Sequence, residues 1–100
     1  GISHTIADMK ARLETSRLLV YQAASKLDRA RDVALDASMV KLFVSEAYVQ
    51  TAQDALRIHG GAGYVNETGM ARPLRDAVGS TLYSGTSEIQ RNIIAGWLGL

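Results

Sequence analysis

Two long runs of apolar or small residues recur at steps of three and four along the chain, and this spacing limits the possible folds more than any other feature. The first run contains Ile6, Met9, Leu13, Ser16, Val20, Ala23 and Leu27, and the second contains Val40, Phe43, Val44, Ala47, Thr51, Ala55 and Ile58. Such steps place these residues on one face of an α-helix. The chain shows no alternating strand pattern and no repeat of fixed period, so the pattern predicts an all-α fold.

The first helix is predicted at about residues 5–30. Thr5 has the hydroxyl of an N-cap residue, and Asp8 follows three positions later, which is the spacing of a helix start. Lysine, arginine and glutamate side chains fall mostly off the apolar face, as expected for a helix with one solvated side.

The second helix is predicted to follow a short connection near residues 33–36, with Asp36 or Ser38 as its N-cap. Gly60 and Gly61 are predicted to end it, because glycine tolerates the left-handed conformation that follows many helices. Two long helices joined by a short link pack antiparallel.

Residues 61–71 are predicted to form a loop, because Gly63, Asn66 and Gly69 interrupt any helical pattern. Arg72 and Pro73 restart a helix, since proline is accepted in a first turn. The short apolar face of this third helix consists of Leu74, Ala77, Val78 and Leu82. With the last helix, the prediction is an antiparallel bundle of four helices.

The last helix follows a glycine-containing turn, and its start is the most informative local signal. Ser87 and Gln90 have the spacing of a capping box, and Thr86 is an alternative cap. Ser84 and Gly85 then lie in the turn just before a helix N-terminus, where free N–H groups favour anions and polarised oxygens. Ordinary capping and turn formation would explain the same residues.

Composition narrows the function classes. The chain has 100 residues, of which 47% are hydrophobic, and a formal net charge of +1. That charge gives no general electrostatic reason to bind nucleic acid. The absence of cysteine excludes a disulfide scaffold and a thiol nucleophile and fits a reducing compartment, so we expect a cytoplasmic protein. No metal site is predicted, and no apolar run is long enough to cross a bilayer.

Three segments stand in order in the second half of the chain: Ile58-His59-Gly60-Gly61-Ala62-Gly63-Tyr64, Leu74-Arg75-Asp76-Ala77 and Tyr83-Ser84-Gly85-Thr86-Ser87-Glu88-Ile89-Gln90-Arg91. Together they resemble the C-terminal helical domain of the acyl-CoA dehydrogenase family. Residues 9–17 are also similar to a helix of that domain. The resemblance implies that residues 1–100 are part of the C-terminal helical domain of a larger flavoprotein, whose family fold adds an N-terminal helical domain and a central β-domain.

The resemblance implies FAD as cofactor and the α,β-dehydrogenation of an acyl thioester, either acyl-CoA or carrier-bound. Thr86 and Glu88 match positions that contact FAD, and Gly60 and Gly61 match a stretch that approaches the FAD of a neighbouring subunit. A homo-oligomer, dimer or tetramer, is therefore expected. Arg57 stands where the family usually has glutamine, and it either reaches the flavin pyrophosphate or is solvated.

Ser84 occupies the position where most family members have the glutamate that removes the substrate α-proton. A serine hydroxyl is too weakly basic for this step without a partner. Three explanations fit: the base lies on an earlier helix, the protein has lost dehydrogenase activity or is one subunit of a mixed assembly, or the flavin is used differently. We favour the first. The alternative to an enzyme is a catalytically silent helical oligomerisation domain. Glu67 is an alternative base, but a glutamate is common at that loop position in the family, which favours a structural role.

By the same resemblance, the substrate-binding residues are Ser84 and Gly85. The backbone N–H of Ser84 is expected to donate to the thioester carbonyl and so to acidify the α-proton. Gly85 keeps the turn able to present that N–H. We expect the isolated 100 residues to be inactive, because most of the flavin site lies elsewhere.

Overall fold

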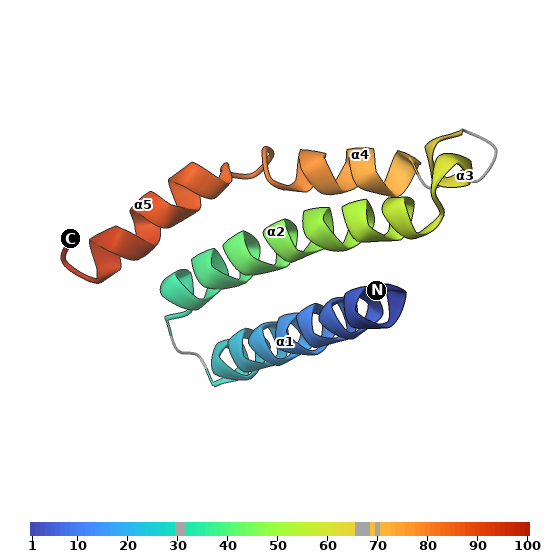
Figure 1. The fold of residues 1–100 in the computed structure, drawn as a ribbon. Helices are drawn as coiled ribbons and strands as arrows, with labels where there is room; N and C mark the ends of the chain where they lie inside the picture. The colour runs from blue at the N-terminus through green and yellow to red at the C-terminus, as the bar shows by residue number, and fades with distance from the viewer. Residues whose placement is uncertain (30–31, 66–68, 70) are drawn as a thin grey trace.

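Five helices make up the part of the chain that the computed structural model describes, which is residues 1–29, 32–65, 69 and 71–100 (Figure 1). They are α1 (Ile2–Asp28), α2 (Ala34–Ile58), α3 (Gly61–Tyr64), α4 (Ala71–Ser80) and α5 (Ser87–Trp97). α2 packs against all four others, and α1 and α4 run antiparallel to it (Figure 1). The predicted all-α fold class is confirmed: four helices of ten or more residues form the bundle, and α3 adds a single turn.

α1 and α2 are joined by two ion pairs that lie far apart along the helices. Arg12 Nη1 donates to Asp54 Oδ2 at 2.8 Å, and Lys26 Nζ donates to Asp36 Oδ1 at 2.9 Å. Both carboxylates lie in largely buried residues, so each needs a partner to offset its lost hydration. The hydrogen bond from Arg12 is the main reason that the pKa of Asp54 lies below its usual value.

The predicted start of the first helix is wrong. α1 begins at Ile2, and Thr5 lies inside it, where its Oγ1 donates to the Gly1 carbonyl oxygen at 3.4 Å. A hydroxyl that bonds to the carbonyl four residues earlier satisfies itself within the helix and leaves no need for a cap there. α1 ends at Asp28, and residue 30, where the helix was predicted to end, lies outside the described residues.

The predicted cap of the second helix is also wrong. α2 begins at Ala34, before Asp36 and Ser38, and both of these residues are buried in its first turns. Asp32 Oδ1 accepts from the Ala34 N–H at 2.9 Å. Asp32 therefore satisfies one of the free N–H groups of the helix start.

The predicted loop at residues 61–71 is wrong over its first four residues, which form α3, and at Ala71, which begins α4. Gly60 has a φ of 61° and follows the end of α2, as the sequence predicts. Gly63 is buried, and a Cβ there would collide with the Leu56 carbonyl oxygen. Only glycine lets this turn fold back so closely onto the last turn of α2. Asn66, which belongs to the predicted loop, lies outside the described residues.

The core of the described chain is thin. Ala52 and Ala77 are its buried apolar residues, and no large side chain is fully buried. Several large apolar side chains are more than half exposed, among them Leu18 and Tyr21 on α1 and Trp97 on α5. Exposed apolar surface of this extent is typical of a face that another part of a protein or another subunit covers.

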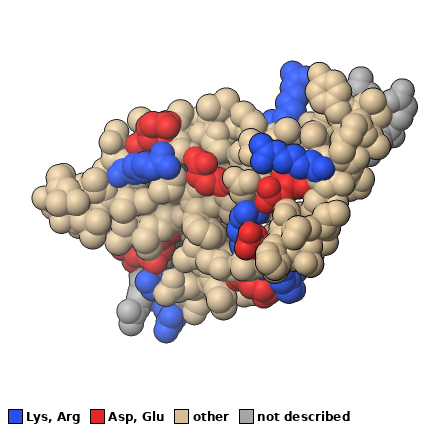
Figure 2. All heavy atoms as spheres, in the orientation of Figure 1, with Lys and Arg blue, Asp and Glu red and all other residues tan. Residues whose placement is uncertain are grey.

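Charges of both signs lie side by side on the molecular face shown in Figure 2, without a patch of one sign. On α1, Lys10 Nζ donates to Glu14 at 2.9 Å and Arg17 Nη1 donates to the same carboxylate at 3.2 Å. Among the described helices, none combines the length and the hydropathy that a membrane span requires.

Candidate functional site

The turn between α4 and α5 has an unusual backbone. Its two central residues, Ser84 and Gly85, have φ angles of 56° and 94°. Ser84 is the only described non-glycine residue with a positive φ. Holding an L-residue in that region costs about 1–2 kcal/mol, so the surrounding contacts must impose this conformation.

α5 begins immediately after this turn with Thr86 as its cap. Thr86 Oγ1 accepts from the Ile89 N–H at 3.2 Å, which confirms the Thr86 alternative over Ser87. Ser87 instead donates its hydroxyl proton to Glu46 Oε1 on α2 at 2.7 Å. The start of α5 is thereby both capped and attached to the central helix.

The capping box predicted for Ser87 and Gln90 is wrong. Gln90 is buried, and its side-chain amide reaches back further than a capping box would. Nε2 donates to the carbonyl oxygens of Ser84 and Gly85 at 3.4 Å and 3.5 Å. A Cβ on Gly85 would lie 2.7 Å from that nitrogen, so Gly85 is required by space as well as by its φ.

Lys41 on α2 holds the other side of the turn. Its Nζ donates to the Ser80 carbonyl oxygen at 2.6 Å and to the Gly85 carbonyl oxygen at 3.1 Å. The same nitrogen lies 5.8 Å from the centre of the Tyr83 ring, within the range of a cation–π interaction. Lys41 therefore joins the end of α4 and the start of α5 to the central helix.

The hydrogen bonds from Lys41 and Gln90 engage the carbonyl oxygens of the turn and leave the backbone N–H groups of Ser84 and Gly85 uninvolved. Neither donates to any acceptor in the described part of the chain, and Ser84 is exposed. Free N–H groups on a turn that is fixed from both sides are suited to hold a carbonyl oxygen that gains negative charge during a reaction.

The predicted cofactor residues fall into two groups. Thr86 and Glu88 lie with Ser84 and Gly85 at one end of α4, and Glu88 is exposed, with Oε1 3.8 Å from Arg91 Nη1. The remaining residues are Arg57 in the last turn of α2, Gly60 at the cap of α3 and Gly61 at its start. The end of α2 and α3 lie at the other end of α4 (Figure 1).

α4 has ten residues and is about 15 Å long. One chain therefore does not bring the two groups into a single compact site. This separation is consistent with the implied arrangement in which the glycine pair approaches the FAD of a neighbouring subunit.

The 57–61 segment is open to a ligand. Gly60 and Gly61 are exposed, and a Cβ on either would meet no other atom within 4 Å. Arg57 is exposed and has no carboxylate within ion-pair distance in the described part of the chain. His59 Nδ1 lies 2.8 Å from the Ala55 carbonyl oxygen and donates to it. This histidine therefore satisfies a carbonyl group in the last turn of α2.

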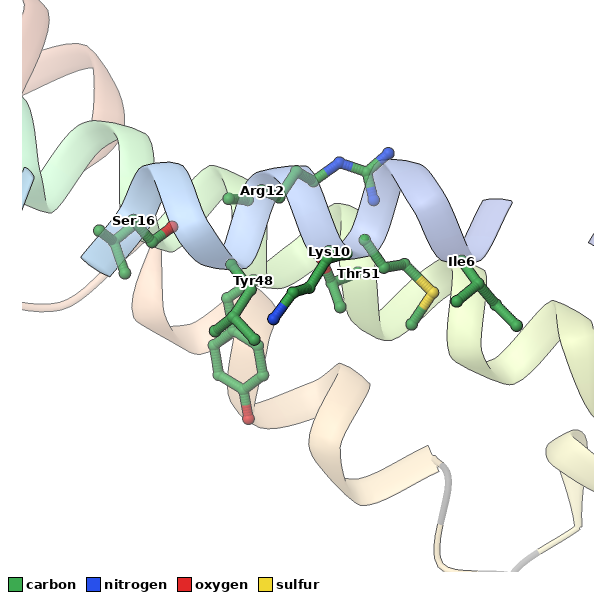
Figure 3. Close-up of a pocket in the computed structure, with 10 residues that line it drawn as sticks. Ile6, Lys10, Arg12, Ser16, Tyr48 and Thr51 are labelled. Atoms are coloured by element: carbon green, nitrogen blue, oxygen red, sulfur yellow. The ribbon is translucent and has the colours of Figure 1, made fainter. Parts of the chain in front are cut away.

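Two apolar grooves run along the α1–α2 pair. One, of about 400 Å³, lies between Ile6, Ser16, Tyr48 and Thr51 (Figure 3). The other, of about 580 Å³, has Val20 and Leu27 of α1 on one side, and Lys41 and Tyr83 lie at its wall. Neither groove is lined by Ser84 or by the glycine pair.

Titratable clusters suited to metal binding are absent: among the described residues, no three histidine, cysteine, aspartate or glutamate side chains converge. Glu67, the alternative base, lies outside the described residues.

Sequence reasoning missed Lys41 and Glu46. Their signal was weak, because each is a charged residue within a long amphipathic helix, where a solvated position is the usual interpretation.

The fold and the turn together define an all-helical domain that presents a fixed, donor-rich turn at a helix N-terminus. A family model described as acyl-CoA dehydrogenase, C-terminal domain, matches residues 1–99. The chain belongs to the acyl-CoA dehydrogenase family and represents its C-terminal domain.

Individual proteins of the family are similar in both sequence and structure. An acyl-CoA dehydrogenase of Bacillus subtilis (strain 168) is 47% identical over 98 residues, which is 98% of this chain and 26% of that protein. The crystal structure of the prolyl acyl carrier protein oxidase AnaB superposes with a TM-score of 0.97 at 44% identity, over 99% of this chain and 26% of that one. The structure of PigA with FAD and proline has a TM-score of 0.95 at 44% identity, with the same coverage. The chain thus spans about a quarter of the length of these relatives.

Proposed function

We propose that the full-length protein is an FAD-dependent dehydrogenase of acyl thioesters, and that this domain supplies the turn that holds the substrate carbonyl. The relatives support the reaction class, since they include an acyl-CoA dehydrogenase and an oxidase of a prolyl carrier protein. The observation that carries the proposal is that the backbone N–H groups of Ser84 and Gly85 have no acceptor among the described residues. Lys41 and Gln90 hold the turn that carries them from two sides.

The residues present fit FAD. A pyrophosphate needs donors that it can reach, and the exposed Gly60 and Gly61 leave the backbone accessible beside the exposed Arg57 guanidinium, which forms no ion pair with the described residues. At the other end of α4, Thr86 and Glu88 lie at the N-terminus of α5. In this proposal the two groups serve flavins of different subunits. When bound, FAD supplies the acceptor for the hydride that leaves the substrate β-carbon.

In the proposed mechanism, the Ser84 N–H donates to the thioester carbonyl oxygen. The negative charge that grows on this oxygen as the α-proton leaves is then stabilised by a donor already in place. The Ser84 hydroxyl takes no part as a base. The α-proton goes to a carboxylate outside residues 1–100, on an earlier helix.

The full-length protein, with FAD bound, provides the test. It is mixed without oxygen with acyl-CoA thioesters of several chain lengths and with a prolyl thioester on its carrier protein, and the flavin absorbance is followed. We expect at least one thioester to bleach the flavin. Persistent oxidised flavin with every thioester would contradict the proposal.

Two variants of Ser84 separate its backbone from its side chain. Ser84→Ala keeps the N–H, so we expect flavin reduction within about threefold of the unchanged protein. Ser84→Glu places a carboxylate at the usual family position, and with the base already supplied elsewhere it should not accelerate reduction. A tenfold or greater acceleration by Ser84→Glu would show that the base is missing rather than relocated.

We also propose that the protein is a homo-oligomer, dimer or tetramer. The separation of the two groups of flavin residues and the exposed apolar side chains of α1 and α5 support it. The alternative, a silent assembly domain without flavin chemistry, predicts the same association. Sedimentation of the full-length protein tests assembly, and its flavin content separates the two functions. The cytoplasmic location remains a prediction.

A further inference from the structure

Lys41 differs from the other half-buried lysine of the described chain in the partners that it has. Lys26 pairs with the carboxylate of Asp36 at 2.9 Å. Lys41 has no carboxylate partner in the described residues, and its ammonium donates only to two backbone carbonyls, those of Ser80 and Gly85. A lysine that is half removed from water and paired only with neutral acceptors is less favourably placed than an ion pair.

The two carbonyls lie on either side of the Ser84 backbone. Ser80 is the last residue of α4, and Gly85 follows Ser84 directly. The Tyr83 ring, also next to Ser84, lies 5.8 Å from the same ammonium. Lys41 therefore restrains the backbone before and after Ser84, whose N–H has no acceptor in the described part of the chain. It does so from α2, the helix that packs on all the others.

We propose that Lys41 is a positioning residue of the active site, which sets the direction of the Ser84 N–H without touching the substrate. The inference rests on the proposed function, because it assigns a role within that reaction. The positive φ of Ser84 is unfavourable for an L-residue, so release of one tether would let the turn relax. A donor displaced by about 1 Å can cost on the order of 100-fold in rate.

The test compares two identical substitutions in the full-length protein with FAD bound. Lys41→Met removes the ammonium but keeps an unbranched apolar stem, and Lys26→Met does the same at a lysine away from the turn. Both should lower the melting temperature. We expect kcat to fall about 10- to 100-fold for Lys41→Met with KM changed less than threefold, and kcat to stay within about twofold for Lys26→Met.

A second readout separates positioning from general loosening. With a thioester deuterated at the α-carbon, we expect a larger kinetic isotope effect in Lys41→Met than in the unchanged protein, because removal of a less acidified proton becomes slower relative to other steps. Lys41→Arg, which keeps a cation and several donors, should recover kcat at least threefold relative to Lys41→Met.

The possible outcomes are distinct. If no thioester reduces the flavin of the unchanged protein, the proposed function fails. If the unchanged protein is active and Lys41→Met has the same kcat and isotope effect, the role of Lys41 is refuted and the proposed function stands. Should Lys41→Met lose its flavin, Lys41→Leu, which also lacks a donor, replaces it: a reduced kcat with full flavin content supports the role, and an unchanged kcat overturns it.

Discussion

Gly85→Ala and Gly79→Ala form a matched pair that tests how the Ser84 turn is held. The same methyl group is added at two glycines six residues apart. At Gly79, inside α4, the new Cβ would have Tyr83 Cε2 at 3.7 Å as its nearest neighbour, an ordinary contact. At Gly85, with a φ of 94°, it would lie 2.7 Å from Gln90 Nε2.

The two changes should have opposite signs. For Gly85→Ala, the positive φ costs about 1–2 kcal/mol, and displacement of the Gln90 amide costs about 1 kcal/mol more. The reduced entropy of the unfolded chain offsets about 0.4–1 kcal/mol, which leaves a loss of about 2 kcal/mol. Gly79→Ala gains about 0.5–1 kcal/mol, because alanine is the better residue inside a helix.

Amide hydrogen exchange of the full-length protein, read on peptides that cover residues 79–92, measures these local free energies. A loss of 2 kcal/mol corresponds to about 30-fold faster exchange in Gly85→Ala, and a gain of 0.5–1 kcal/mol to about two- to fivefold slower exchange in Gly79→Ala. Exchange in Gly85→Ala equal to that of the unchanged protein would refute the view that Gln90 and the backbone together fix this turn.

Three further changes probe the contacts around α2 and α5. Asp54→Asn removes a carboxylate whose pKa is held below its usual value by the hydrogen bond from Arg12. The Arg12–Asp54 pair stabilises the fold fully at pH values above 3.8, the pKa of Asp54 in the unfolded chain. This stabilisation is lost as the pH falls through the lower pKa of the folded state. The variant should therefore show a flatter loss of stability below about pH 4 in an acid titration followed by circular dichroism. Ser87→Ala breaks the hydrogen bond to Glu46 and should cost about 1 kcal/mol, seen as faster exchange in the first turn of α5. Thr86→Ala removes the cap of α5 and should cost about 1 kcal/mol in the same measurement, whereas Thr86→Ser should cost little.

The helices were predictable from the sequence because their signal repeats. Steps of three and four over about twenty residues leave no other regular structure for α1 and α2. The helix starts were not predictable in the same way, because several residues compete for each cap. Asp36 has the chemistry of a cap, but Lys26, ten positions away, binds its carboxylate, and Asp32 instead accepts from the first N–H of α2.

α3 shows a second limit. Glycine-rich segments have a low helical preference of their own, which favoured a loop over residues 61–64. The turn forms because Gly63 packs directly on the backbone of Leu56. That contact belongs to the packed structure and has no local signature beyond the glycine itself.

The candidate site was predicted in part. The family resemblance pointed to Ser84 and its neighbours, and the local pattern left Thr86 and Ser87 as alternative caps. The choice between them depends on Glu46, which lies 41 residues before Ser87 and accepts a hydrogen bond from its hydroxyl. Lys41 was missed, although it lies three and seven positions before Val44 and Tyr48 on the same helical face.

The most direct test of the proposed function is a crystal structure of the full-length protein with FAD and a thioester that cannot be dehydrogenated. We predict that the carbonyl oxygen of this thioester lies about 2.7–3.1 Å from the Ser84 backbone nitrogen, with a carboxylate from outside residues 1–100 next to the α-carbon. A thioester whose carbonyl oxygen is held by other donors, with the Ser84 N–H facing solvent or other protein atoms, would contradict it.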